Sequence, residues 1–436
     1  MVELHLAKVD VVGSNPIARS ILVFEASGRA ANRHAGSWRV GVLFLLTAGL
    51  GVAEEAPPRR YPILVLDDPP HMPTQRQVNE NFLSVHRWLV RALQPELSTT
   101  PGRLLHLAVD ALLFLPLTHE EAHRSVLTRE GIAASSRPWF GRDGTARVTN
   151  VRDDDLQRLR DRNLPTFVRL HTAGLESDAR IAHAAETLAA WGAEDPDVLW
   201  SDHAVRRLAI VGYHAGGLFG WSPDLPEESD ERERDVVGHD VYGMIRHLHR
   251  PEMPFRRYTE FDDLTPDERR MARRIGARTW VNLASPLLFG RSHWAIDDGA
   301  RICASLAYGL TPFGDMFEQN FWRADGALGL HLYLREYQNR AAWFPAAGIR
   351  LAPFDPRRRV GWDLALHVWR QPRRLAFDEA DGTWGCAADL TARWRPLPGA
   401  HWSVDVGALA KTEGHLPEAA TLGADVVVRA GVSWIW

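Results

Sequence analysis

The stretch Leu328-Gly329-Leu330-His331-Leu332-Tyr333-Leu334-Arg335 has leucine at every second position. Successive side chains of a β-strand point to opposite faces of the sheet, so this period of two places the leucines on one face and small or polar residues on the other. The same alternation recurs at 362–369, 388–394, 402–408 and 426–436. The pattern predicts a series of antiparallel strands in the last third of the chain.

Turn-forming residues separate these segments, as at Asp355-Pro356, Asp381-Gly382 and 396–399. Further strand candidates lie at 279–288, 302–308 and 346–352. Such a sheet must cover its edges or close on itself. We therefore expect residues 276–436 to form an antiparallel β-barrel domain of about eight strands.

The preceding region, residues 54–275, has helical rather than strand periodicity. Apolar residues recur every three or four positions in 76–93, and comparable patterns occur at 154–163, 176–191 and 239–249. The charged, proline-bearing segment 222–235 is typical of a solvated loop. The fold class expected is α+β multidomain, with a mainly helical domain at 54–275 in front of the barrel.

An export signal is indicated near the N-terminus. Arg33, His34 and Arg39 precede an apolar run over 40–50, which ends in small residues. A basic flank, a short apolar stretch and small residues form the pattern of a secretory signal peptide. Residues 1–53 are thus interpreted as a leader extension plus signal peptide, with the mature chain beginning near Glu54. The alternative is a buried core helix.

Overall composition limits the possible partners. The net charge of −4 gives no basic footprint for nucleic acid. Only two cysteines, Cys303 and Cys386, are present, so no disulfide framework is expected, and a single bridge between them stays open.

The segment His119-Glu120-Glu121-Ala122-His123 has the form HExxH. In a helix, residues four apart lie on one face, so the two histidines can share a metal ion, with Glu120 beside it to accept a proton from water. Thr118 and Glu121 match a capping box, which would start the helix at His119. Pro116 as a first-turn residue keeps a helix through both histidines in either case.

The motif resembles that of the zincin metallopeptidases, in particular the gluzincin branch. This resemblance implies a Zn²⁺ cofactor, and a third ligand supplied by a Glu on a downstream helix. Glu176 is the first candidate for that ligand and Glu186 the second. The segment 238–243 partly resembles an element of the aspzincin branch, and this makes Asp240 a competing ligand.

The same resemblance implies a hydrolytic mechanism. Glu120 would act as general base, and Tyr242 or His239 would stabilise the oxyanion that forms on attack. Against this stands a non-catalytic interpretation, in which the histidines only pack or face solvent.

The predicted strands also resemble those of outer-membrane β-barrels, which alternate apolar-out and polar-in between aromatic girdles. Tryptophans fall near the predicted strand ends, at Trp362, Trp369, Trp384, Trp394, Trp402, Trp434 and Trp436. A half-buried soluble sheet would produce the same alternation.

Together these features predict an exported zinc-dependent hydrolase, a metallopeptidase, in the periplasm or outer membrane of a Gram-negative-type bacterium. Its substrate would be a peptide, a protein or another cell-envelope component, such as a lipid or cell-wall amide. The alternative is a non-enzymatic outer-membrane β-barrel protein with a periplasmic helical domain that binds a partner.

Overall fold

The fold is taken from a computed structural model of the chain. It describes residues 5–6, 24–25, 59–69, 72–140, 145–222, 227–296, 299–326, 328–353, 358–397 and 399–435. The chain divides into two units, Met1–Glu55 and Ala56–Trp436. In the first unit, β1 (His5–Leu6) pairs antiparallel with β2 (Phe24–Glu25). The leader and signal peptide expected at 1–53 otherwise lie outside the described residues.

The helices of the second unit occupy most of the region in which helices were expected. They are α1 (Gln75–Ala92), α2 (Gln94–Leu97), α3 (Thr100–Val109), the π-helical turn η1 (Asp110–Phe114), α4 (Leu115–Arg129), α5 (Asp153–Arg162), α6 (Leu164–Ala190), α7 (Pro196–Phe219), α8 (Asp240–His249) and α9 (Pro266–Arg278). The predictions for 76–93, 154–163, 176–191 and 239–249 are confirmed as helix. Helix α6 begins well before the predicted segment, because Pro165 is placed in its first turn and Asn163 caps it.

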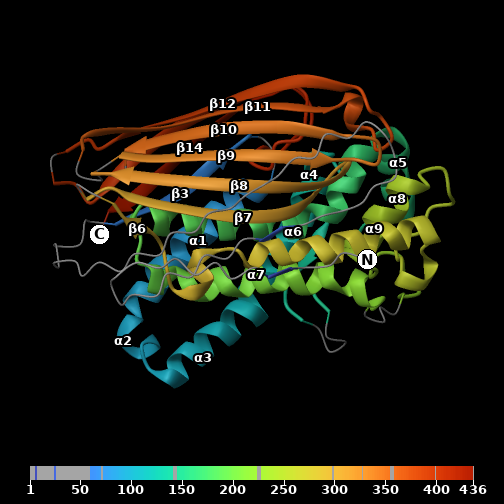
Figure 1. The fold of residues 1–436 in the computed structure, drawn as a ribbon, viewed down its shortest axis with the longest axis horizontal. Coiled ribbons are helices and arrows are strands. Elements are labelled where there is room, and N and C mark those ends of the chain that lie inside the picture. The colour runs from blue at the N-terminus through green and yellow to red at the C-terminus, as the bar shows by residue number, and fades with distance from the viewer. Residues whose placement is uncertain are drawn as a thin grey trace. The chain divides into compact units, whose positions relative to one another are not determined.

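A ten-stranded antiparallel sheet forms the other layer, in the order β3-β14-β13-β12-β11-β10-β9-β8-β7-β6. Its strands are β3 (Arg60–Asp67), β6 (Trp294–Ala295), β7 (Arg301–Thr311), β8 (Gly314–Asp325), β9 (Leu328–Gln338), β10 (Trp343–Pro353), β11 (Val360–Pro372), β12 (Gly382–Trp394), β13 (Trp402–Lys411) and β14 (Asp425–Ile435). Figure 1 shows the strands side by side above the helices.

Four details of the predicted barrel were wrong. The sheet has ten strands instead of eight, and it is open, with β3 and β6 at its two edges. Residues 279–288 form the short 3₁₀ helices η3 (Thr279–Leu283) and η4 (Pro286–Phe289), because Pro286 cannot donate to a strand ladder. Strand β3, from the region expected to be helical, pairs with β14. Helices and sheet therefore lie in one compact unit.

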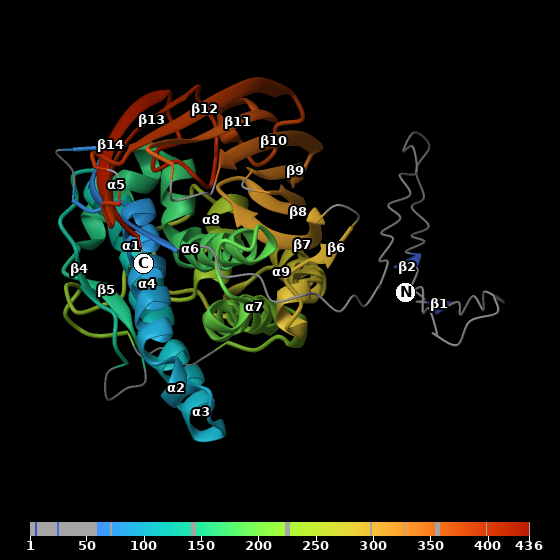
Figure 2. The same ribbon diagram turned by 90° about the vertical axis from the view of Figure 1, so that its left-hand side faces the viewer.

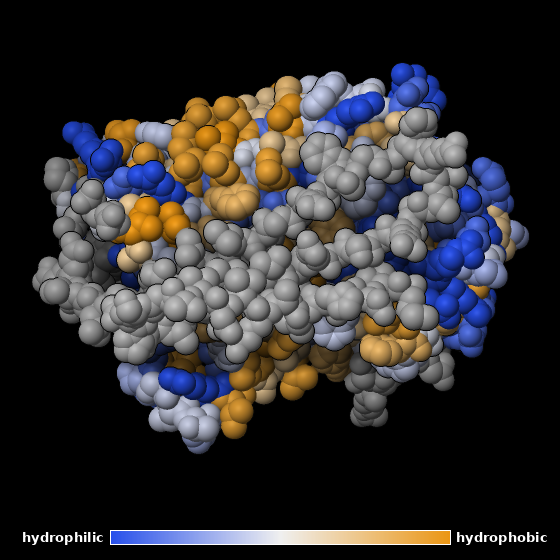
Figure 3. All heavy atoms as spheres, viewed as in Figure 1, coloured by the Kyte–Doolittle hydropathy of each residue, from blue (hydrophilic) through white to orange (hydrophobic). Residues whose placement is uncertain are grey.

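The polarity of the sheet is inverted relative to a soluble sheet. On β9, Leu332 and Leu334 are exposed on the outer face, whereas His331, Tyr333 and Arg335 are buried on the inner face. Figure 2 shows the sheet arched over α6, and Figure 3 shows apolar residues gathered on its outer surface. Apolar side chains thus point away from the protein, and polar ones point into it.

The concave face of the sheet encloses charged groups. Arg335 binds both Glu318 and Glu418, and Arg350 binds Asp363. A cavity of about 380 Å³ lies among these residues and the facing sides of α1 and α6. Buried charges must be paired, and here ion pairs between neighbouring strands, together with the pair to Glu418 in the connection between β13 and β14, satisfy that requirement.

Exposed tryptophans follow the two rims of the sheet. One row lies where β11 and β13 begin and where β12 and β14 end: Trp362, Trp394, Trp402 and Trp434. Trp384 and Trp343 lie near the opposite rim. Trp369, expected in a girdle, instead points inward and is buried; Trp436 lies outside the described residues.

One helical stretch of the described residues, Thr100–Arg129, is long and apolar enough to cross a membrane by length and composition. Its second part, α4, is largely buried against other helices of the protein.

Cys303 and Cys386 are both free, so the disulfide that the sequence left open is not formed.

Candidate metal centre

The HExxH motif lies inside a helix. Helix α4 begins at Leu115, with Pro116 in its first turn, and continues to Arg129. The helix therefore starts before Thr118, which the capping-box pattern had suggested as its N-cap residue. His119 and His123 lie on one face of α4, with their ring centroids 5.0 Å apart.

The first residue of α8 completes a three-residue group. Asp240 Oδ2 lies 3.2 Å from His119 Nε2 and 3.7 Å from His123 Nε2. The possible ligand atoms of these three residues all lie within 4.8 Å of one another. Helix α8 begins directly after Gly238, which has a positive φ of 63° and turns the chain into the site.

Both histidine rings are oriented by hydrogen bonds on their far side. His119 Nδ1 donates to Asp178 Oδ2 at 2.8 Å, and His123 Nδ1 donates to the Leu170 carbonyl at 2.6 Å. Carboxylate and carbonyl oxygens only accept, so the proton of each neutral ring is placed on Nδ1 and the lone pair on Nε2. Metal-binding histidines characteristically have such partners.

The donor set fits a zinc ion. Asp240 Oδ2 is buried and has no hydrogen-bond partner among the described residues. Ligands about 2.05 Å from a tetrahedral zinc lie about 3.3 Å from each other, close to the two separations measured here. Two imidazole nitrogens and one carboxylate leave a fourth position free, as catalytic zinc sites require.

Glu176, the first candidate for the third ligand, is not part of this group. Its carboxylate forms a buried ion pair with Arg169, about two turns earlier in α6. The reason lies in helical geometry: residues four apart share a face, so Gly174 and Asp178 both face the motif, and Glu176 points elsewhere. Glu186 likewise pairs with Arg207. The competing candidate, Asp240, is the one that lies with the histidines.

Gly174 allows α6 to approach the motif. A Cβ atom at this position would lie 2.2 Å from His119 Nε2, a distance that non-bonded atoms do not tolerate. The His119 ring therefore rests directly on the α6 backbone.

We expect Gly174→Ala to displace the His119 ring and weaken zinc binding by about 10–100-fold, the range seen when ligand orientation is lost. Gly212→Ala is the matched control, because a Cβ on this α7 glycine would contact nothing within 4 Å. That control should keep its zinc affinity. Equal zinc affinities for the two variants, measured by competition with a chelating dye, would contradict this account of Gly174.

Glu120 is buried beside the histidines. Burial raises the pKa of the Glu120 carboxyl well above its ordinary value, and the nearby charge of Asp235 raises it further. Burial also raises the pKa of Asp235, to about 6. A carboxylate with a raised pKa is a better proton acceptor near neutral pH, so this environment suits a general base. Glu121, by contrast, forms an ion pair with Arg124.

The two candidates for oxyanion stabilisation have different surroundings. Tyr242 donates its hydroxyl proton to the Trp221 carbonyl at 2.5 Å and is fully buried. His239 stacks on Tyr242 with ring centroids 3.8 Å apart, and burial lowers its pKa to about 4. Tyr213, which the sequence did not single out as a site residue, lies beside the motif, with its ring centroid 6.3 Å from that of His119. Its hydroxyl is hydrogen-bonded to the Asp240 backbone.

Sequence reasoning missed Asp178, Gly174 and Tyr213. The first two could have been found from their spacing of four in the segment 173–178, once its helical face was considered. No family model, no curated protein and no solved structure matches this chain.

Proposed function

We propose that this protein is a zinc-dependent hydrolase of the cell envelope, held at a membrane by the outer face of its sheet. The observation that carries the proposal is the convergence of His119 Nε2 and His123 Nε2 on Asp240 Oδ2, an otherwise unpartnered buried atom. In this assignment His119, His123 and Asp240 are the ligands, and Glu120 is the general base.

When bound, zinc would supply Lewis acidity, lowering the pKa of water and polarising a carbonyl group. The residues of the chain have complementary roles. Asp178 holds His119, and Arg206 in turn donates to Asp178 at 2.8 Å, which fixes the carboxylate. Glu120 accepts a proton from the attacking water and passes it to the leaving group. Tyr213, beside His119, is the candidate donor to the developing oxyanion.

The outer face of the sheet supports the membrane part of the proposal. On β12, Trp384 and Trp394 lie ten residues apart, near opposite rims. Ten residues span about 33 Å along a strand, and at a tilt of about 40° this projects to about 25 Å, the height of the apolar band in outer-membrane barrels. A lipid bilayer is therefore the proposed occupant of this face. A peptide, a lipid or a cell-wall amide near that membrane is the proposed substrate class.

The test is the metal content and activity of purified protein. Wild-type protein is expected to bind zinc in this site and to hydrolyse casein, a phospholipid or peptidoglycan when the three are assayed in parallel. Asp240→Ala and His123→Ala should each lose this zinc and all zinc-dependent hydrolysis, because two remaining ligands do not hold a catalytic ion.

Glu176→Gln is the control for the choice of third ligand. Because it breaks a buried ion pair, it should cost about 3–5 kcal/mol of stability, yet it should keep the zinc. Loss of the zinc in Glu176→Gln but not in Asp240→Ala would overturn the assignment. Metal-free wild-type protein would overturn the proposed function.

A further inference from the structure

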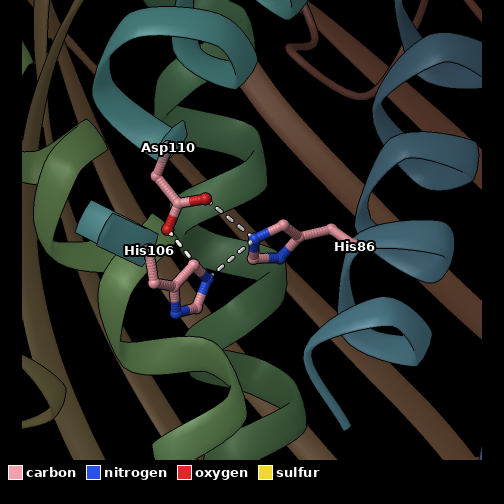
Figure 4. A group of neighbouring side chains, drawn as sticks. All are labelled: His86, His106 and Asp110. Carbon is pink, nitrogen blue, oxygen red and sulfur yellow. Dashed lines mark hydrogen bonds and ion pairs between the residues drawn. The ribbon is translucent and has the colours of Figure 1, made fainter. Parts of the chain in front are cut away.

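A second group of two histidines and one aspartate lies outside the proposed catalytic site. His86 comes from α1, His106 from α3, and Asp110 from the start of the π-helical turn η1. Figure 4 shows the three side chains pointing toward one another. Their possible ligand atoms lie within 4.8 Å of one another, and Asp110 is fully buried.

The separations within this group match those of ligands around one small cation. His86 Nε2 lies 3.3 Å from His106 Nε2 and 2.9 Å from Asp110 Oδ1, and His106 Nε2 lies 3.2 Å from Asp110 Oδ2. Ligands of a tetrahedral zinc ion are about 3.3 Å apart. Asp110 Oδ2 is buried and has no hydrogen-bond partner among the described residues; it meets only the ion pair with His106 Nε2, so it is available as a ligand atom inside the group.

The backbone that carries Asp110 also departs from a regular α-helix. Helices α3 and α4 are joined through η1, whose five residues Asp110–Phe114 are wound as a π-helix. Such turns insert one extra residue into a helix and are frequent at functional sites. Phe82 stacks on the His86 ring and Phe114 packs edge-on against it, which fixes the orientation of the imidazole.

The position of the group suggests what a bound ion would do. Helices α2 and α3 project from the body of the protein (Figure 2). None of the residues of α3 is buried, so hydrophobic packing contributes little to hold this helix. His106 and Asp110 connect α3 to His86 on α1. An ion bound by all three residues would hold the projecting helices α2 and α3 against α1.

We propose that His86, His106 and Asp110 form a second divalent transition-metal site, of the zinc type, that fastens α3 to α1. This site is structural, because the ligands hold two helices together in nearly closed surroundings. It is independent of the proposed catalytic zinc, since it shares no ligand with His119, His123 and Asp240.

Metal stoichiometry tests the proposal. The purified full-length chain, stripped with a chelator and reloaded with Zn²⁺, is expected to bind two ions, measured by plasma mass spectrometry. His86→Ala, His106→Ala and His123→Ala should each bind one, and the double variant His86→Ala/His123→Ala none. His401→Ala, an exposed histidine outside both groups, should bind two. If His86→Ala and His106→Ala retain the wild-type stoichiometry, the group is only a hydrogen-bonded triad and the proposal fails.

Amide hydrogen exchange provides a second readout, which measures the mobility of α3 instead of the metal content. In the His123→Ala background, adding Zn²⁺ to the stripped protein should slow exchange in residues 100–114 at least several-fold. Adding Zn²⁺ to the double variant should not. Unchanged exchange in His123→Ala would contradict the fastening role. A wild-type protein that binds one ion, lost in His86→Ala and kept in His123→Ala, would refute the catalytic site while supporting this one.

Discussion

Glu120→Gln is expected to keep its zinc and lose hydrolysis by about 10²–10⁴-fold, the usual contribution of a general base. The substitution removes the proton-accepting oxygen but leaves His119, His123 and Asp240 unchanged. A glutamine of nearly equal size also preserves the packing of this buried side chain. Metal content and kcat on the best substrate of the panel, measured on the same preparation, check the prediction.

The neighbouring residue offers a matched control. Glu121 lies next to Glu120 in α4, but its carboxylate binds Arg124 at 2.6 Å. Glu121→Gln should therefore keep both the zinc and the activity, although it should lower stability, because it removes the ion-pair partner of the buried Arg124. If both glutamine variants lose activity alike, the proton acceptor is not Glu120. If neither does, the site does not hydrolyse by this mechanism.

The second large effect concerns the outer face of the sheet. Leu332→Arg is expected to reduce the free energy of unfolding from a lipid bilayer by about 2–4 kcal/mol, because it places a charge in the middle of the proposed apolar band. Leu332 lies midway along β9 and points outward. Denaturant titration of protein folded into phosphocholine vesicles measures this change.

Glu336→Arg is the companion variant. Glu336 is exposed on the same face of the same strand, four residues further toward the rim. A charge at the interface costs about 0–1 kcal/mol, so this variant should fold almost as stably as the wild type. Equal stability of the two variants in vesicles, together with a wild-type chain that stays monomeric in buffer without lipid, would show that the face is solvated.

Sequence patterns predicted many of the strands and helices, but not how all of them pair and pack. Period-two alternation identified seven of the strands, and helical periodicity identified α1, α5, α6 and α8, because both patterns are local. Strand β3 was missed, since its pairing with β14 joins residues more than 350 positions apart. The open form of the sheet was missed as well, because it depends on the helices that pack beneath it.

The sequence by itself determined the motif His119 to His123, the helix that contains it and the period-two alternation of the strands, whereas only the structure showed that the apolar face of the sheet points outward. The motif, its helix and the alternation follow from spacing along one element. Only the tertiary structure decided the third member of the metal group, because Asp240 and Glu176 are both plausible ligands until α6 and α8 are packed against α4. Packing then turned Asp178 toward His119 and Glu176 toward Arg169. The helical period fixes which residues share a face, but only the fold determines which face meets the motif.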